Sequence, residues 1–350
     1  MTIPMTPDRP PIDRAGLLEE FLHAGDWAGA QVTPLAGDAS RRRYFRLSRS
    51  DGRGAILMDA PPEAGEDVRP FLAVGAYLQS LGLSAPRIFE TDEERGFLIL
   101  EDFGQTLFDR LCARTPACEP ELYDAAVDVL LRLAAAPPLA HAADYTPLMT
   151  DLALSSYRWY AAPVVGHDMT EAAEAARAVL APLIATLGPG RVTILRDYHA
   201  QNLLWLPERD GAARVGLLDF QDAMLGHPAY DLISLTTDAR RDVSGTIRER
   251  CMARFTTALG LDPVEFTRAA ATCSVQRNLR ILMIFSRMSL HFGKPHYVDL
   301  IPRVWAHLQR DLDHPDLAPL ARLVRAHLPA PDTHVLQSLK DRCGTIPTLQ

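Results

Sequence analysis

Short apolar runs separated by polar turns predict an antiparallel sheet over the first hundred residues. The first three runs are AQVTPLAG, RRRYFRLSR and GAILMDAPP, and their alternation is typical of half-buried strands. A helical pattern follows at VRPFLAVGAYLQSLGL and is stopped by Gly82 and then by Pro86. Two more strand-like runs, PRIFETD and GFLILEDFG, come next. We therefore expect residues 1–103 to form a lobe with a five-stranded sheet and one helix.

Helical periodicity dominates from Gln105 onward. It is present in TLFDRLC, PELYDAAVDVLLRLAAA, DLALSSYRWYAA and MTEAAEAARAVLAPLIATLG. Two short apolar runs, VTILRDYHAQNLLWL and ARVGLLDFQDA, interrupt the helices once, and helices resume to about residue 328. The pattern predicts an α+β chain with a mainly helical lobe at 104–330 and a C-terminal tail at 331–350.

The composition narrows the class of protein. A hydrophobic fraction of 47% with 23% charged residues is typical of a soluble globular protein, and no run approaches the roughly 18 apolar residues of a membrane span. The N-terminus has no apolar segment behind a basic start, so we expect no secretory signal and a cytoplasmic protein. The net charge of −8 disfavours a nucleic-acid partner. The five cysteines form no CxxC pair and are expected to be reduced thiols.

Lysine is nearly absent from the chain. Only Lys294 and Lys340 occur, so 34 of the 36 basic residues are arginine. A fixed cation before residue 294 must therefore come from arginine, a metal ion or a helix N-terminus.

The interruption in the helical lobe concentrates polar residues beside apolar strands: Asp197, His199, Asn202, Asp219 and Asp222. Buried carboxylates need a cation to hold them together, and carboxylate and amide oxygens suit Mg²⁺, which also takes substrate phosphates. Asp197 would then accept a proton from a hydroxyl nucleophile, while Asn202 and Asp219 hold the metal. Capping of a turn explains a single aspartate such as Asp222 equally well, but it does not explain the set.

These residues resemble a known family. RDxxxxN at 196–202, with Asp219 of LLDF 17 residues after Asn202, is similar to the catalytic and metal-binding loops of protein kinases and aminoglycoside phosphotransferase-like kinases. The run DAMLGHPAYDL at 222–232 resembles the phosphotransferase branch. The resemblance implies a bilobal protein-kinase-like fold, with Asp197 as base, Asn202 and Asp219 as Mg²⁺ ligands, and Asp231 as a buried acceptor that braces the catalytic loop.

The resemblance also implies that the first lobe binds ATP. LILEDFG, residues 98–104, would be the hinge whose backbone contacts adenine, which assigns Glu101 and Phe103 to the nucleotide. Asp219 and Asp231 are only 12 positions apart, which leaves no room for the activation segment on which a protein kinase docks a peptide. A small-molecule acceptor is therefore favoured.

Longer strings narrow the resemblance within the family. GDASRRRYFRL, LMDAPPE, GLLDFQDAMLGHPAYDL and GKPHYVDLIPRVW are similar to the cell-wall recycling kinases that phosphorylate the anomeric hydroxyl of N-acetylmuramate and N-acetylglucosamine. The product implied is a sugar 1-phosphate, which a nucleotidyltransferase could convert to a UDP-sugar for peptidoglycan synthesis.

Two positions depart from the family pattern. Leu195 stands where histidine is usual, so its structural hydrogen bond must come from elsewhere, with Arg196 and His199 as candidates. Met58 stands where a lysine normally grips the phosphates, and the first lobe has no lysine. Either the chain is a non-catalytic nucleotide binder, or arginine supplies the charge.

The arginine candidates follow the turn AGDAS, so we expect Ser40, Arg42 and Arg43 to contact the nucleotide. Strand alternation places Arg42 and Arg43 on opposite faces, so the two are not expected to share one role.

The acceptor pocket is the least constrained part of the prediction. Muramic sugars carry a carboxylate, so the pocket should offer a cation, from Arg240 and Arg241 or from Arg277 and Arg280. The substrate-binding set that we predict is His199, Asp222, Arg240 and Arg280. Each arginine is explained equally well as a surface or salt-bridged helix residue. A kinase for an aminoglycoside or an amino alcohol, and a non-catalytic regulator, remain alternatives.

Overall fold

The computed structural model describes residues 13–35 and 41–347. The chain divides into two compact units, the first comprising Met1–Ala76 and Ala85–Gly104, and the second comprising Tyr77–Ser84 and Gln105–Gln350. Helix α2 (Arg69–Ser80) begins in the first unit and ends in the second. The last division falls at Gly104, beside the boundary that the sequence pattern predicts.

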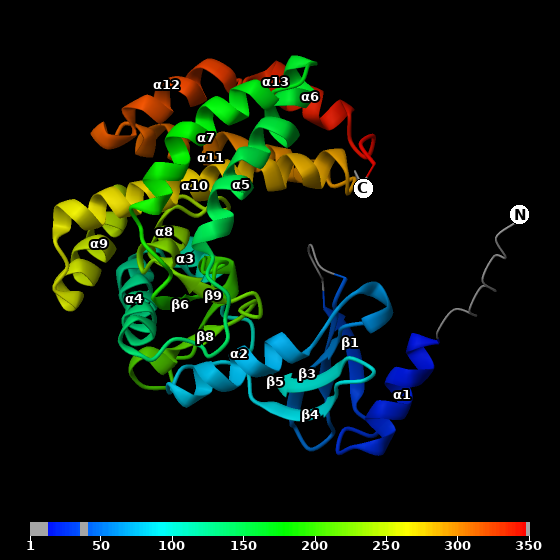
Figure 1. The fold of residues 1–350 in the computed structure, drawn as a ribbon. Helices are drawn as coiled ribbons and strands as arrows, with labels where there is room; N and C mark the ends of the chain where they lie inside the picture. Colours follow the sequence, from blue (N-terminus) through cyan, green and yellow to red (C-terminus); the bar gives the residue numbers. More distant parts are fainter. Residues whose placement is uncertain (1–12, 36–40, 348–350) are drawn as a thin grey trace, which may run out of the picture. The chain divides into compact units, whose positions relative to one another are not determined.

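The first unit is built on one antiparallel sheet (Figure 1). Its strand order is β1–β2–β3–β5–β4, and the strands are β1 (Gln31–Leu35), β2 (Arg43–Ser48), β3 (Gly54–Asp59), β4 (Ile88–Asp92) and β5 (Phe97–Glu101). Every neighbouring pair is antiparallel. The predicted five-stranded sheet is confirmed, and α2 is the predicted helix.

A second helix, α1 (Arg14–Ala24), covers one face of this sheet, so the prediction of a single helix in this lobe was wrong. Asp13 caps α1 by accepting a hydrogen bond from the Gly16 amide at 3.0 Å. Its apolar residues pack into a core made up of Phe21, Leu22, Trp27, Leu47, Ala55, Leu57, Phe97 and Ile99. The helical spacing of those apolar residues is present in the sequence RAGLLEEFLHA.

The second unit is mainly helical. Its longer helices are α3 (Phe108–Arg114), α4 (Glu119–Ala135), α5 (Thr146–Ser156), α7 (Thr170–Ala185), α8 (Ala229–Thr236), α9 (Gly245–Leu259), α10 (Pro263–Leu290), α11 (Ile301–Leu312), α12 (Ala318–His327) and α13 (Thr333–Asp341). Helix α10 runs through the middle of this layer and packs against α5, α8 and α11 (Figure 1). The expected C-terminal tail in fact contains α13, which Asp332 caps and which buries Val335 and Leu339.

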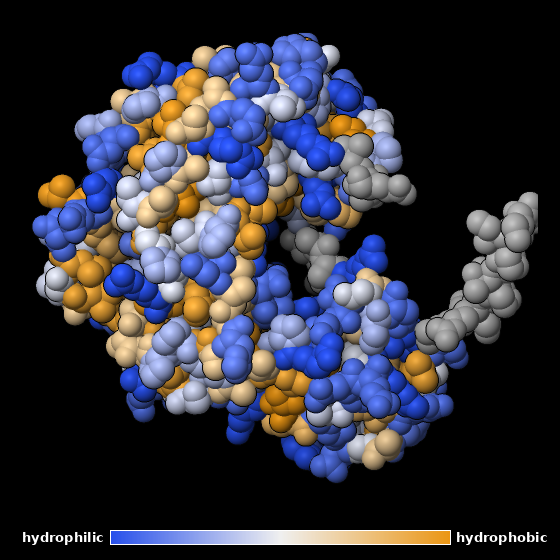
Figure 2. All heavy atoms as spheres, in the orientation of Figure 1, coloured by the Kyte–Doolittle hydropathy of each residue, from blue (hydrophilic) through white to orange (hydrophobic). Residues whose placement is uncertain are grey.

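Helix α10 is the longest helix of the described chain, with 28 residues, and polar residues occur along its whole length. No helix in the described ranges has a stretch apolar enough for its length to cross a bilayer. On the face shown in Figure 2, hydrophilic and hydrophobic residues are interspersed over the second unit.

Two short two-stranded ladders interrupt the helices and frame the polar cluster. β6 (Val192–Ile194) pairs with β9 (Met224–Gly226), and β7 (Leu203–Trp205) pairs with β8 (Val215–Leu217). The loop 195–202 leaves β6, and the loop 218–223 leaves β8. The ladders therefore bring two polar loops, separated by 15 residues of chain, next to each other.

Candidate active site

Asp231, at the start of α8, fixes the loop that follows β6. Its Oδ2 accepts a hydrogen bond from the Leu195 amide at 2.5 Å, and its Oδ1 accepts one from the Arg196 amide at 2.9 Å. Arg196 has a φ of 70°, the left-handed region that this turn requires. Burial raises the pKa of Asp231 to about 7, against the two backbone hydrogen bonds that favour its ionised form. Asp231 thus holds the loop at Leu195 through backbone amides. The side chains of Arg196 and His199, which were the candidates for this hydrogen bond, do not make it.

The loops bring together Asp197, Asn202 and Asp219, the three residues that the motif singles out. Asn202 Nδ2 donates to the Asp197 carbonyl at 2.8 Å and lies 3.5 Å from Asp219 Oδ2. The Leu218 amide donates to the Asn202 carbonyl at 3.0 Å, which ties one loop to the other. Gln221 Nε2 donates to Asp219 Oδ1 at 2.8 Å. The donor set, one amide oxygen and one exposed carboxylate, fits a hard cation such as Mg²⁺.

Asp197 is held as a carboxylate. Burial by itself would raise its pKa, but the positive charges of Arg280 and Arg277 on α10 bring the pKa below its usual value. Asp197 is only partly buried, so a ligand can reach it. An ionised, reachable carboxylate can accept a proton from a hydroxyl group.

His199 lies next to these residues and is neutral at physiological pH. It is 6% exposed, and burial lowers its pKa to about 4. Its Nε2 lies 3.3 Å from Arg240 Nη1 and 3.5 Å from Asn202 Nδ2. Because both neighbours donate, Nε2 must accept and the proton resides on Nδ1. That Nδ1 has no hydrogen-bond partner among the described residues.

The predicted acceptor residues lie in different settings. Arg280 hydrogen-bonds the Tyr230 hydroxyl, and Arg240 lies against His199. Arg241 donates to Glu119 at 2.7 Å and is an ordinary ion pair with α4. Asp222 is exposed, and its carbonyl accepts a hydrogen bond from Arg196 Nη1 at 3.1 Å.

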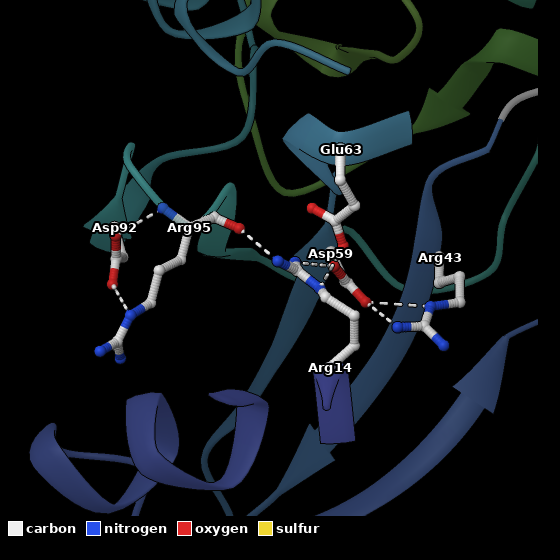
Figure 3. Close-up of polar contacts among 6 residues, drawn as sticks. All are labelled: Arg14, Arg43, Asp59, Glu63, Asp92 and Arg95. Carbon is white, nitrogen blue, oxygen red and sulfur yellow. Dashed lines mark hydrogen bonds and ion pairs between the residues drawn. The ribbon is translucent and has the colours of Figure 1, made fainter. Parts of the chain in front are cut away.

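The first unit separates the two arginines that were expected at the nucleotide. Arg43 donates to Asp59 Oδ2 at 2.9 Å, and Arg14 of α1 binds the other oxygen of the same buried carboxylate (Figure 3). Arg42 instead pairs with Glu66 at 2.8 Å and hydrogen-bonds Tyr44. Arg43 therefore belongs to the α1 face of the sheet, which argues against a nucleotide role for it.

The remaining nucleotide candidates flank this sheet. Glu101 ends β5, where its amide donates to the Arg87 carbonyl at 2.8 Å and its carboxylate pairs with Arg87 at 3.3 Å. Phe103 follows β5 and is partly buried. Met58 is fully buried on β3 opposite Tyr44. Ser40 lies outside the described residues.

One acidic residue near the site was missed by sequence reasoning. Asp238 follows α8 and is 2% exposed. Its Oδ1 accepts a hydrogen bond from the Arg240 amide at 2.8 Å, and within the described chain its Oδ2 has no hydrogen-bond partner. In the segment TDARRDV the sequence indicates a role only for the arginines, because a single aspartate beside a helix end is indistinguishable from a cap.

Comparison with known proteins gives one consistent result. The model of the phosphotransferase enzyme family matches residues 31–267. The N-acetylmuramate/N-acetylglucosamine kinase of Caulobacter vibrioides is 37% identical, with 91% of this chain and 97% of the relative covered. The kinase of the same name from Pseudomonas aeruginosa is 34% identical, with 89% and 94% covered.

The fold has solved counterparts of low sequence identity. An aminoglycoside phosphotransferase with ADP bound is similar with a TM-score of 0.58 at 13% identity, covering 88% of this chain and 99% of that chain. A choline kinase from Streptococcus pneumoniae is similar with a TM-score of 0.54 at 13% identity, covering 93% and 99%. At such identities the likeness concerns the fold alone, and it confirms the predicted protein-kinase-like α+β fold.

Proposed function

The chain belongs to the phosphotransferase enzyme family and is a small-molecule kinase, and from that premise we propose that it phosphorylates the anomeric hydroxyl of N-acetylmuramate and N-acetylglucosamine with ATP. The names of its relatives support a sugar as acceptor. The observation that carries the proposal is that two loops bring Asp197, Asn202 and Asp219 together, while the arginines of α10 lower the pKa of Asp197. Membership of an enzyme family argues against the alternative of a non-catalytic regulator.

The proposed reaction is a single displacement. Asp197 orients the sugar hydroxyl and takes its proton as the oxygen attacks the γ-phosphorus and ADP leaves. Mg²⁺, held by Asn202 and Asp219, would neutralise charge on the transferred phosphoryl group. Asp231 keeps Asp197 in place through the backbone of the loop. Catalysis would come mainly from positioning and charge neutralisation.

Charge near Asp197 favours this acceptor over cationic ones. Aminoglycosides and amino alcohols carry ammonium groups, and an acceptor site for them should present carboxylates. Here Arg277 and Arg280 act on Asp197 from α10, and Arg240 lies beside His199. A neutral or anionic sugar suits these arginines better.

The proposal also covers the residues that bind ATP and the pathway that uses the product. We assign adenine to the backbone around Glu101 and Phe103 and the phosphates to Arg42, with Ser40 as a further prediction. The sugar 1-phosphate is a substrate for a nucleotidyltransferase that makes a UDP-sugar, which would place the enzyme in cytoplasmic peptidoglycan recycling.

Replacement of Asp197 by asparagine tests the base. Asp197→Asn should lower kcat by about 10³-fold and leave ATP affinity nearly unchanged, because the amide keeps the shape and loses the proton acceptor. ADP release and ATP binding are measured in parallel, and ³¹P NMR identifies the phosphorylated oxygen of the product. The exposed Asp210 provides the control, since Asp210→Asn should retain wild-type turnover. Turnover near wild type in Asp197→Asn, or a product phosphorylated elsewhere, would refute the assignment.

A further inference from the structure

Arg277 and Arg280 of α10 form no ion pair with a carboxylate of the described residues, unlike several arginines around them. Nearby, Arg241 pairs with Glu119, Arg303 with Asp242, and Arg310 with Asp311. Arg277 is 5% exposed, and Arg280 is partly buried. The nearby negative charge is that of Asp197, which forms no direct ion pair with either arginine in the described chain. A buried guanidinium without a direct ion-pair partner is costly. The two positions therefore suit an anion that arrives with a ligand.

The hydrogen bonds of Arg280 hold it in position without neutralising it. It donates to the Tyr230 hydroxyl, and that hydroxyl lies 3.3 Å from the hydroxyl of Tyr145. The rings of the two tyrosines pack edge to face with centroids 5.1 Å apart. A guanidinium has five N–H donors, so one bond to a hydroxyl leaves donors for a carboxylate.

Arg277 supports Arg280 from one helical turn away. Its Nη2 donates to the Ser234 hydroxyl at 2.6 Å, and its Nε has no partner among the residues described. Being almost fully buried, Arg277 adds positive potential to the site, whereas Arg280 is partly exposed and can contact a ligand directly.

The other arginines near Asp197 are less suited to this role. Arg196 stacks on the ring of Tyr145 at 5.1 Å and donates to the Asp222 carbonyl. Arg240 lies on His199 Nε2. Arg241 is neutralised by Glu119.

We propose that Arg280 binds the carboxylate of an acidic acceptor sugar and so sets the preference for N-acetylmuramate over N-acetylglucosamine. The inference rests on the proposed function, because those two sugars share the reacting hydroxyl and differ in the carboxylate-bearing lactyl group. A guanidinium can bind a carboxylate through two parallel hydrogen bonds, which fixes the orientation of the sugar as well as its affinity. N-acetylglucosamine offers Arg280 no anion.

The test compares two substrates in one variant. In Arg280→Gln the ratio of kcat/KM for N-acetylmuramate to that for N-acetylglucosamine should fall by about 30-fold or more. Arg287, a partly buried arginine of the same helix that stacks on Trp159 and Phe292, provides the matched control. Arg287→Gln should leave the ratio unchanged. Circular dichroism of each variant confirms that it is folded.

The substrate ratio separates carboxylate recognition from an effect on catalysis. If Arg280 acts only by adjusting Asp197, both sugars lose rate in parallel, the ratio stays constant, and the inference is overturned. The methyl ester of N-acetylmuramate gives a second measure. The wild-type enzyme should disfavour the ester relative to the acid, and Arg280→Gln should not distinguish them.

Failure of the proposed function has a different signature. A wild-type enzyme that phosphorylates neither sugar refutes the proposed acceptors, whereas a wild type that phosphorylates both with an Arg280→Gln ratio equal to its own refutes only the role of Arg280.

Discussion

At the scale of single residues, Arg43, the first residue of β2, and Arg42 just before it have different surroundings. Arg43 shares the buried carboxylate of Asp59 with Arg14 (Figure 3). Arg42 hydrogen-bonds Tyr44, whose partner across the sheet is Met58, the position where the sequence resemblance predicts a lysine. Arg42 therefore lies on the same face of the sheet as Met58, where its guanidinium pairs with Glu66, and we propose that it supplies the cation for the phosphates.

Replacing Arg42 should weaken binding of the phosphates. Arg42→Ala is expected to raise the KM for ATP by about tenfold, since a charged hydrogen bond contributes roughly 1.5–3 kcal/mol, and Arg42→Lys should restore part of it. The affinity for adenosine should stay unchanged, because adenosine has no phosphate. Calorimetric titration of both ligands provides the measurement. In Arg43→Ala the thermal stability should drop while the KM for ATP stays unchanged. A raised KM for ATP in Arg43→Ala together with an unchanged KM in Arg42→Ala would disprove these two roles.

At the scale of elements, the strands and loops that carry chemistry were predictable, and their surroundings were not. The alternation of β1 to β5 and the RDxxxxN spacing are local signals, so they survive in the sequence. Which arginine meets a carboxylate depends on residues such as Asp59 and Glu119, which become neighbours only through packing. Asp238 and the three-residue strand β9 lack any local signal, whereas α1 had one that was overlooked.

Helix α1 offers a prediction at this scale. Phe21 is 9% exposed and stacks on Phe97 of β5 with centroids 5.4 Å apart. Phe21→Ala should therefore destabilise the first unit by about 3 kcal/mol through loss of buried surface and the cavity left behind. Urea unfolding is the measurement, with Glu19→Ala, an exposed change in the same helix, expected to unfold as wild type. A Phe21→Ala transition that coincides with wild type would show that α1 contributes little to the unit.

At the scale of the whole molecule, buried histidines make stability depend on pH. Burial lowers the pKa of His199, His227 and His307 to about 4 from the usual 6.5. Below pH 6.5 the unfolded chain binds protons at these positions and the folded chain does not, so stability is complete above pH 6.5 and is lost as the pH falls toward 4. Asp231, with its raised pKa, works in the opposite direction over this range, but it is one group against three.

The free energy of unfolding should accordingly decline between pH 6.5 and 4. Measured by urea titration at several pH values, the decline should become shallower in His307→Gln, because that variant has one fewer depressed pKa. His23 is exposed, so His23→Gln should reproduce the wild-type slope. Equal slopes in all three proteins would mean that His307 titrates alike in both states.

The methionine in β3 has a consequence for chemical labelling. A nucleotide analogue that carries an acylating group needs a lysine amine near the bound nucleotide. Met58 has no amine, and the two lysines of the chain, Lys294 and Lys340, are both in the helical unit, with Lys340 paired to Asp299. Such an analogue should therefore find no lysine to acylate in the first unit.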